Sequence, residues 1–226
     1  MGSAVAEQVE ERTDKRGALR QRNRQALIEA TLDCVSELGI ARTSVSTIIA
    51  RAGLSRGMIH LHFESKDKLL EAAIAHANAI YYQQLEAMLA QAGPSPQDTI
   101  DAIVRSDLSE AVLNRRYVSI WYAFRGEARE REIFKQYSDT RDEGLSAMAR
   151  DAILTMLNAS DASDTGDAAA IAEDAAEGLL AMLEGMWTDF LLHPDEFDRD
   201  RACRICFRYM RAFLPEFFSA AGARAV

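Results

Sequence analysis

The fold of this chain is decided by residues 43–70, which read TSVSTIIARAGLSRGMIHLHFESKDKLL. Four apolar residues near the start of this stretch recur at helical spacing and share one face: Val45, Ile48, Ile49 and Ala52. Ser44 can cap this helix, because its hydroxyl can accept a hydrogen bond from an unpartnered backbone N–H. Gly53 can end the helix, because glycine adopts the left-handed conformation without steric cost. The sequence therefore predicts a short helix over 45–52 that stops at a tight turn.

A second short helix is predicted after the turn, over residues 56–62. Leu54 fills the space between the two helices, and Ser55 is expected to cap the second one. Ile59 and Phe63 are its inward residues. This is the pattern of a helix-turn-helix, in which the second helix lies in the major groove of DNA. The turn alone fits any helical hairpin about as well, so the flanking residues have to decide.

The flanks of this unit are basic. Upstream, between residues 12 and 24, Asp14 is the one acidic residue, and it stands among Arg12, Lys15, Arg16, Arg20, Arg22 and Arg24. Downstream, Lys66 and Lys68 begin the next helix, where Ser65 is the expected cap. Cations and free backbone N–H groups can converge there on a phosphate. The flanks therefore favour a DNA-binding unit.

Charge is distributed unevenly along the 226 residues. The whole chain has a formal net charge of −9, which alone would argue against a nucleic-acid partner. Residues 1–70 contain 11 basic and 9 acidic residues, whereas residues 71–226 contain 15 and 26. An acidic body repels phosphates, so we expect DNA to bind at the N-terminal end only.

Composition narrows the class of protein further. Only four prolines and twelve glycines interrupt the chain, so long helices are expected. No apolar run approaches the roughly 20 residues that cross a bilayer, and no signal peptide is visible, so we expect a cytoplasmic protein without a membrane partner. The chain has no Gly-rich phosphate loop, no H-E-x-x-H, no G-x-S-x-G and no paired Glu-x-x-His. We therefore expect that the protein is not an enzyme.

Candidate metal ligands are few. Cys203 and Cys206 spell C-x-x-C, but a zinc site would need two more ligands and a redox motif would need a βαβ context. Cys34 is the third cysteine. His60 and His62, two positions apart, point to different sides of a helix. We expect structural thiols, no metal and no cofactor.

The chain divides into three predicted regions: a mobile basic arm over 1–17, a helix-turn-helix head over 18–64, and a helical body over 65–226. The first helix of the head should run over 19–38, with Leu27, Ile28, Leu32, Val35 and Leu38 facing inward. A long helix over 65–91 links the head to the body. Further helices are predicted over 96–113, 117–124, 130–157, 168–192 and 196–218, with a loop over 158–167. No strand pattern is visible, so the fold class is all-α.

The last two helices are rich in apolar and small residues. Paired with a second copy, they would form a four-helix interface around a two-fold axis. The candidate interface residues are Leu179, Leu183, Met186, Phe207, Met210 and Leu214. A core within one chain explains the same residues about as well. DNA binding favours the homodimer, because two helix-turn-helix units read a palindrome.

The patterns T-S-V-x-x-I, A-G-L-S-x-G-x-I and H-F-x-x-K-x-x-L resemble the tetracycline-repressor (TetR) family of bacterial regulators over residues 20–70. The stretch around Trp187 and residues 194–197 also resembles the betaine-inhibitor, choline-responsive type. The resemblance implies that Arg56, Gly57, Met58 and His60 face bases, and that Ser44, Ser46, His62 and Lys66 face phosphates. His60 stands where the family usually has Tyr, and Ile49 where it usually has Ala. The first departure changes the chemistry of the base contact, and the second implies different packing between the head helices.

The resemblance further implies a small-molecule effector pocket in the body. Its candidate residues are Asp107, Glu110, Trp121, Tyr122, Phe124, Tyr137, Trp187 and Phe190, which could cage a quaternary ammonium such as choline by cation–π attraction. Aromatic residues at helical spacing are also what a plain core contains. The sequence thus predicts a homodimeric repressor that an effector releases from a palindromic operator. The alternatives are a helical protein-interaction module without DNA binding and a helical enzyme.

Overall fold

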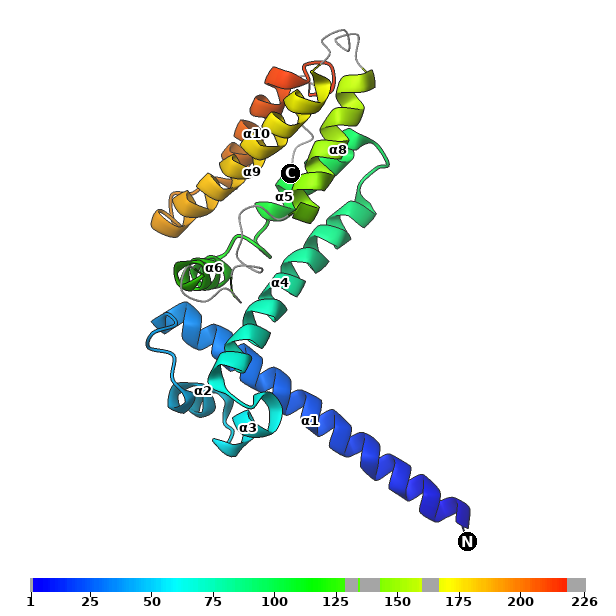
Figure 1. The fold of residues 1–226 in the computed structure, drawn as a ribbon, viewed down its shortest axis with the longest axis vertical. Helices are drawn as coiled ribbons and strands as arrows, with labels where there is room; N and C mark the ends of the chain where they lie inside the picture. The colour runs from blue at the N-terminus through cyan, green and yellow to red at the C-terminus, as the bar shows by residue number, and fades with distance from the viewer. Residues whose placement is uncertain (1, 129–133, 135–142, 160–166, 219–226) are drawn as a thin grey trace. The chain divides into compact units, whose positions relative to one another are not determined.

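The computed structural model describes residues 2–128, 134, 143–159 and 167–218, with side chains from residue 15 onward. Every regular element in these ranges is a helix, which confirms the predicted all-α fold (Figure 1). The chain forms two compact units. The first contains residues 1–78 and 119–137, and the second contains residues 79–118 and 138–226. In the described ranges, we find no helix whose length and hydropathy together would let it span a bilayer.

The first unit contains the predicted helix-turn-helix. Its helices are α1 (Gly2–Leu38), α2 (Val45–Ala52), α3 (Gly57–Phe63) and the first half of α4 (Lys66–Gln91). The apolar pattern predicted that the first helix begins near residue 19, but helix α1 begins at Gly2. Residues 2–18 have no apolar face, but they are rich in Ala, Glu, Gln, Lys and Arg and lack Pro, and these residues favour a helix without packing.

The ends of the short helices follow from a few side chains. Ser44 caps α2 in a capping box: its Oγ accepts from the Thr47 backbone N–H at 3.1 Å, and its own backbone N–H donates to Thr47 Oγ1 at 2.9 Å. Gly53 ends α2 with a φ of 64°. Ser65 caps α4 by accepting from the Lys68 backbone N–H at 3.1 Å. These three predictions are confirmed.

The predicted cap of α3 is wrong. The N-cap is Arg56, and no side chain caps the helix there. Arg56 already has helical dihedral angles, a φ of −55° and a ψ of −37°. Ser55 therefore takes part through its carbonyl oxygen, which accepts from the Met58 N–H at 3.0 Å.

The core of the first unit lies where the helices α1 to α4 meet. Ile59 and Phe63 of α3 are buried, as predicted, whereas Leu38 is only half-buried. Other buried side chains are Leu27, Ile28, Leu32, Val35, Ile48, Leu69, Leu70 and Ile74. Each fully buried Leu or Ile contributes about 1.5–3 kcal/mol relative to an exposed one, so this core fixes α3 firmly on its support.

The second unit is a helical bundle. It contains α5 (Pro96–Asp107), α8 (Glu143–Ala159), α9 (Ala168–Leu192) and α10 (Arg199–Phe213), as well as parts of α4 and α6 (Arg115–Glu127). Helix α9 packs between α8 and α10, and α5 packs against α8 and α10 (Figure 1). Buried alanines on α9, Ala172, Ala175 and Ala176, let its neighbours approach closely.

Three helix boundaries in the second unit differ from the predictions. Helix α5 ends at Asp107, because residues 108–114 form turns. Helix α10 begins at Arg199, where the Asp198 carboxylate caps it by accepting from the Arg201 N–H at 2.9 Å. Helix α8 begins at Glu143 in the described part of the chain, and most of the preceding stretch of the predicted helix over 130–157 lies outside it. Helix α9 matches its predicted range.

Candidate DNA interface and buried carboxyl site

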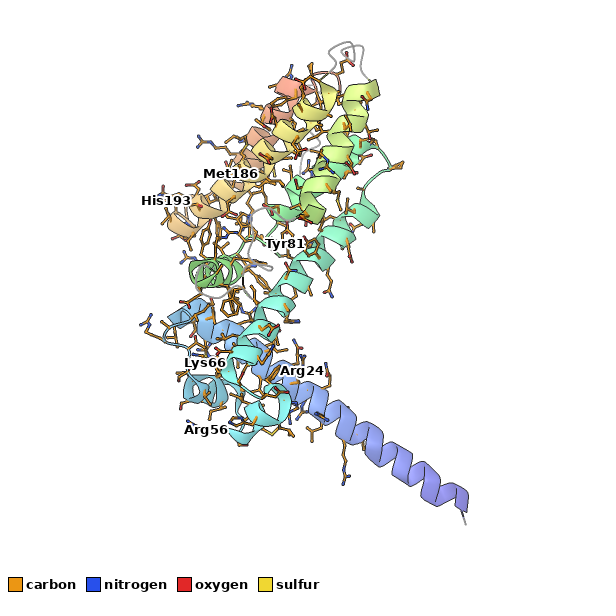
Figure 2. The ribbon with its side chains drawn as sticks, in the orientation of Figure 1. Arg24, Arg56, Lys66, Tyr81, Met186 and His193 are labelled. Atoms are coloured by element: carbon orange, nitrogen blue, oxygen red, sulfur yellow. The ribbon has the colours of Figure 1, made fainter. Side chains whose placement is uncertain are left out.

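The first turn of α3 is open on its outer side. Arg56 is exposed, and its Nη2 donates to Ser46 Oγ of α2 at 3.2 Å, so the guanidinium is positioned by the neighbouring helix (Figure 2). Gly57 is also exposed, and a Cβ atom added there would meet no atom within 4 Å. Met58 is half-buried. An arginine at this place can donate two hydrogen bonds to the edge of a guanine.

His60 lies one turn further along α3 and is exposed. Its Nδ1–H donates to the carbonyl oxygen of Glu64 at 2.9 Å. Glu64 follows α3 with a φ of 68°, a conformation that few residues other than glycine adopt. With Nδ1 occupied by the backbone, Nε2 is the ring atom of His60 that remains for a base.

The residues that the resemblance assigns to phosphates differ in their surroundings. Ser44 and Ser46 are exposed, but Ser44 is committed to the cap of α2 and Ser46 holds Arg56. Lys66 is half-buried at the first position of α4, and we find no ion pair for it among the described residues. The N-terminus of α4 therefore carries a lysine, as a phosphate site requires.

His62 is less accessible than its assignment implies. Its Nε2 is buried without a hydrogen-bond partner in the described part of the chain. Burial lowers the pKa of His62, and the nearby charges of Arg20 and Arg24 lower it further. The guanidinium of Arg24 also lies over the ring of Phe63, 5.0 Å from its centre. The sequence showed these arginines only as a basic flank, whereas the fold brings them beside the end of α3.

A buried carboxyl group stands out in the second unit. Asp107, at the end of α5, has 6% of its surface exposed. Its Oδ2 accepts from Trp187 Nε1 at 2.9 Å and its Oδ1 accepts from Tyr81 Oη at 3.2 Å, so α5, α9 and α4 meet at this group. Burial raises the pKa of Asp107 to about 7, although both hydrogen bonds lower it; the charge of Glu184 adds to the rise. Tyr81 was not among the predicted pocket residues.

Other candidates for the effector pocket make contacts of their own. Phe190 packs against Phe197, with ring centres 5.5 Å apart, and the Arg199 guanidinium lies 5.3 Å from its centre. Glu110 is exposed. Trp121, Tyr122 and Phe124 belong to the first unit, where Phe124 packs against Phe134 as plain core, and Tyr137 lies outside the described residues.

Arg199 holds the turns that follow α5. Its two terminal nitrogens donate to the carbonyl oxygens of Leu108 and Leu113 at 2.7 and 2.6 Å. Burial lowers the pKa of its guanidinium. Asp107 lies immediately before this turn, so Arg199 fixes the position of the carboxyl group indirectly. No spacing in the sequence indicated this contact.

The cysteines behave as buried thiols. Burial raises the pKa of Cys34 and Cys203, and it raises the pKa of Cys206 to about 12. Cys203 and Cys206 lie on the inner side of α10. In the described ranges, no group of three His, Cys, Asp or Glu residues is arranged to hold a metal ion.

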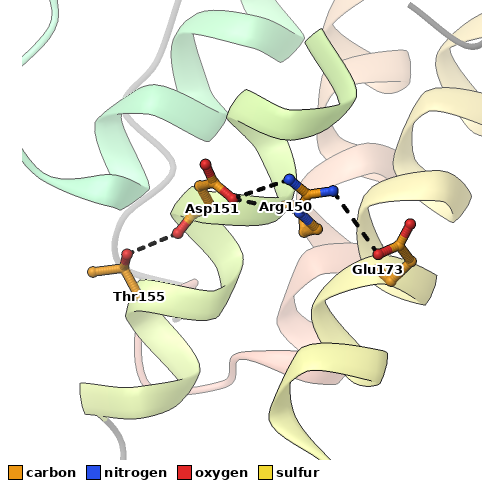
Figure 3. Close-up of polar contacts among 4 residues, drawn as sticks. All are labelled: Arg150, Asp151, Thr155 and Glu173. Atoms are coloured by element: carbon orange, nitrogen blue, oxygen red, sulfur yellow. Dashed lines mark hydrogen bonds and ion pairs between the residues drawn. The ribbon is translucent and has the colours of Figure 1, made fainter. Parts of the chain in front are cut away.

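Two open grooves lie along α9. One, of about 790 Å³, runs between α8 and α9 and is acidic, with Glu143, Glu173, Glu177 and Glu184 in its lining. Arg150 of α8 crosses it: its guanidinium lies 4.0 Å from Glu173 and 3.4 Å from Asp151 (Figure 3). The other, of about 480 Å³, lies between α9 and α10 and includes Met182, Met186 and Ile205.

The predicted dimer residues divide into two groups. Leu179, Leu183, Met210 and Leu214 have at most 3% of their surface exposed and lie in the core of the single chain. Met186 and Phe207 are half-buried, and Met186 lines the groove between α9 and α10 (Figure 2). Only the second group presents surface that a second copy could cover.

Both parts of the chain are similar to known families of proteins. Residues 27–73, which contain the helix-turn-helix, match the family described as bacterial regulatory proteins, tetR family. Residues 96–215 match the family described as BetI-type transcriptional repressor, C-terminal. The HTH-type transcriptional regulator BetI of Pseudomonas paraeruginosa is 29% identical over 188 residues, which cover 83% of this chain and 90% of the relative.

Solved structures agree with these matches. A transcriptional regulator from Pseudomonas aeruginosa PAO1 has a TM-score of 0.74 and 25% identity, and the match covers 86% of this chain and 91% of that protein. A regulator from Saccharomonospora viridis, solved in complex with choline, shares the fold with a TM-score of 0.68 at 17% identity, covering 83% of this chain and 95% of that protein. Since the BetI-type description covers more than half of the residues, this chain belongs to the tetR family of bacterial transcriptional regulators, with a C-terminal part of the BetI repressor type.

Proposed function

We propose that this regulator is a homodimeric repressor that binds a palindromic operator and leaves it when a small cationic effector binds the body. The observation that carries the DNA part is the exposed first turn of α3, where Arg56 is held by Ser46 and Gly57 leaves room for a base edge. Helix α3 would enter the major groove with this turn first. The lysine at the start of α4 would bind a flanking phosphate.

The outer side of the hairpin formed by α9 and α10 supports the homodimer. Met182, Met186 and Ile205 give it a groove with apolar and charged lining, and a second copy related by a two-fold axis would bury this groove against its own. Two copies of α3 would then read two halves of a palindrome. Such a protein acts on chromosomal DNA, so we place it in the cytoplasm.

The buried carboxyl site supports a cationic effector, and a quaternary ammonium such as choline is the first candidate. Asp107 supplies a negative charge when ionised, and the rings of Trp187 and Tyr81, whose centres lie 6.5 Å apart, supply faces for cation–π attraction. A regulator of the same fold has been solved in complex with choline. An effector of this kind would release DNA only if it binds the DNA-free arrangement of the protein more tightly than the DNA-bound arrangement.

The test measures binding of the purified full-length chain to a labelled duplex from its own upstream region. We expect it to bind this duplex at physiological salt at least about 10³-fold more tightly than a random duplex. Sedimentation should give two copies of the chain per duplex, and millimolar choline should weaken the complex. Equal binding to both duplexes would refute the DNA-binding function, a strict monomer would refute the homodimer, and an unchanged complex would refute choline as the effector.

A further inference from the structure

The N-terminal part of α1 lies outside the core of the first unit. The helix begins at Gly2, and among its side chains from residue 15 onward the first buried one is Leu27. Every side chain from residue 15 to residue 22 is exposed. More than two helical turns of α1 therefore have no apolar support, although the same helix continues into the core that carries α3.

This exposed part of α1 is strongly basic. Residues 15–24 read KRGALRQRNR, so five of the ten residues are Lys or Arg, and no acidic residue follows until Glu29. Arg16, Arg20 and Arg24 are four positions apart, which places them along one side of the helix. We call residues 15–24 the basic ridge.

The basic ridge reaches the recognition helix at its inner end. Arg20 and Arg24 lie close enough to His62 of α3 to lower its pKa, and Arg24 lies against the ring of Phe63 (Figure 2). Both contacts lie within the first unit. Arg20 and Arg24 therefore lie beside the C-terminal end of α3, while Arg16 and Arg22 are exposed.

We propose that the basic ridge is a second DNA-binding surface, which binds backbone phosphates of the DNA that flanks the palindrome read by α3. When α3 lies in the major groove, the ridge projects from its C-terminal end, over the strand that borders the groove. Its side chains would neutralise phosphates without reading sequence, so they would add affinity and salt dependence but no base preference. The inference rests on the DNA-binding function proposed above and extends it to flanking DNA.

The test compares the full-length chain with the triple variant Arg16→Gln, Arg20→Gln and Arg22→Gln. Gln keeps a high helix propensity, and Arg24 is left in place because it packs on Phe63. A matched control removes the same charge from α10 through Arg204→Gln, Arg208→Gln and Arg211→Gln, three exposed residues of the body. Helical content and the oligomeric state are checked for all three proteins.

Operator affinity is measured as a function of salt on a long duplex and on one trimmed to the palindrome. On the long duplex, the ridge variant should lose about 0.9 from the salt slope for each phosphate contact removed, while its preference for operator over random DNA changes less than twofold. On the trimmed duplex, wild type and ridge variant should converge. The control should keep the wild-type slope on both.

Several outcomes would overturn the inference. An unchanged slope for the ridge variant would show that the ridge does not touch DNA. An equal loss in the control would show a long-range charge effect, and an equal loss on both duplexes would place the contacts inside the palindrome. Tighter binding by the variant would show that the ridge opposes DNA binding. If wild type itself fails to prefer the operator, the DNA-binding function has failed, which is a separate result.

Discussion

The carboxyl group of Asp107 is buried, and burial raises its pKa to about 7 from an ordinary value of 3.8. Between these two values the folded chain holds a proton that the unfolded chain has lost. The free energy of unfolding therefore falls as the pH rises through this window, by up to about 1.4 kcal/mol per pH unit from this group. At pH 8 the ionised Asp107 destabilises the fold, and below pH 4 it has no such effect.

We expect Asp107→Asn to remove this pH dependence. The amide oxygen can still accept from Trp187, and the amide N–H can donate to Tyr81, so both contacts survive without a buried charge. The variant should be more stable than wild type by a few kcal/mol at pH 8 and nearly equal to it at pH 4. Urea unfolding at both pH values checks this. The exposed Asp189→Asn should follow wild type, and parallel profiles for Asp107→Asn and wild type would contradict the assignment.

Arg56 and Lys66 should affect DNA binding in different ways. Arg56→Ala is expected to cost about 1–3 kcal/mol of discrimination between operator and altered operator, since a bidentate contact to guanine is lost. Lys66→Ala should weaken all sequences alike and lower the salt slope by about 0.9. Titrations of operator and random duplexes at several salt concentrations separate the two effects. The same change in both variants would rule out these separate roles.

At the level of helices, Arg199 joins α10 to the turns that follow α5 by two charged hydrogen bonds to backbone carbonyl oxygens. We expect Arg199→Met to destabilise the chain by about 2–5 kcal/mol, because Met keeps the aliphatic stem but leaves the oxygens of Leu108 and Leu113 without their donor. Thermal unfolding measures this. Arg204→Met, at an exposed position on the same helix, is the control and should change stability by less than about 0.5 kcal/mol.

Helices with local signals were predictable from the sequence. The capping serine and the left-handed glycine defined α2 to the residue, and the polar loop before Ala168 and Pro194 after Leu192 defined α9. The start of α1 was not predictable from apolar spacing, because residues 2–18 have no regular apolar spacing and are instead rich in residues with high helix propensity.

Contacts between distant residues were not predictable. Trp187 and Asp107 are 80 residues apart and Tyr81 and Asp107 are 26 apart, so no spacing pattern relates them. The candidate pocket was chosen by residue type. Of that set, Asp107 and Trp187 share a hydrogen bond, whereas Phe124 is a buried residue of the other unit. His62 was assigned to phosphate by its place in the motif, and its burial beside Arg20 could be found only from the fold.

For the whole molecule, the proposed effector and the operator must be coupled in both directions. If choline weakens operator binding by some factor, then operator must weaken choline binding by the same factor. Calorimetric titration of choline into the free protein and into the operator complex measures the second factor, and operator titration with and without choline measures the first. Unequal factors would mean that choline acts at more than one site. If both factors equal one, choline does not affect operator binding and is not the effector.

The same coupling should depend on pH through Asp107. A proton and a cation compete for its carboxylate, so choline should bind about tenfold more weakly at pH 6 than at pH 8, given a pKa of about 7. The charge of Glu184 and the thiol of Cys206 also lie near this carboxyl. In Asp107→Asn, choline affinity should be low and independent of pH, while operator affinity without choline stays at the wild-type value, since Asp107 lies in the second unit and α3 in the first. If the choline concentrations that release wild type from the operator also release this variant, the effector binds elsewhere in the body.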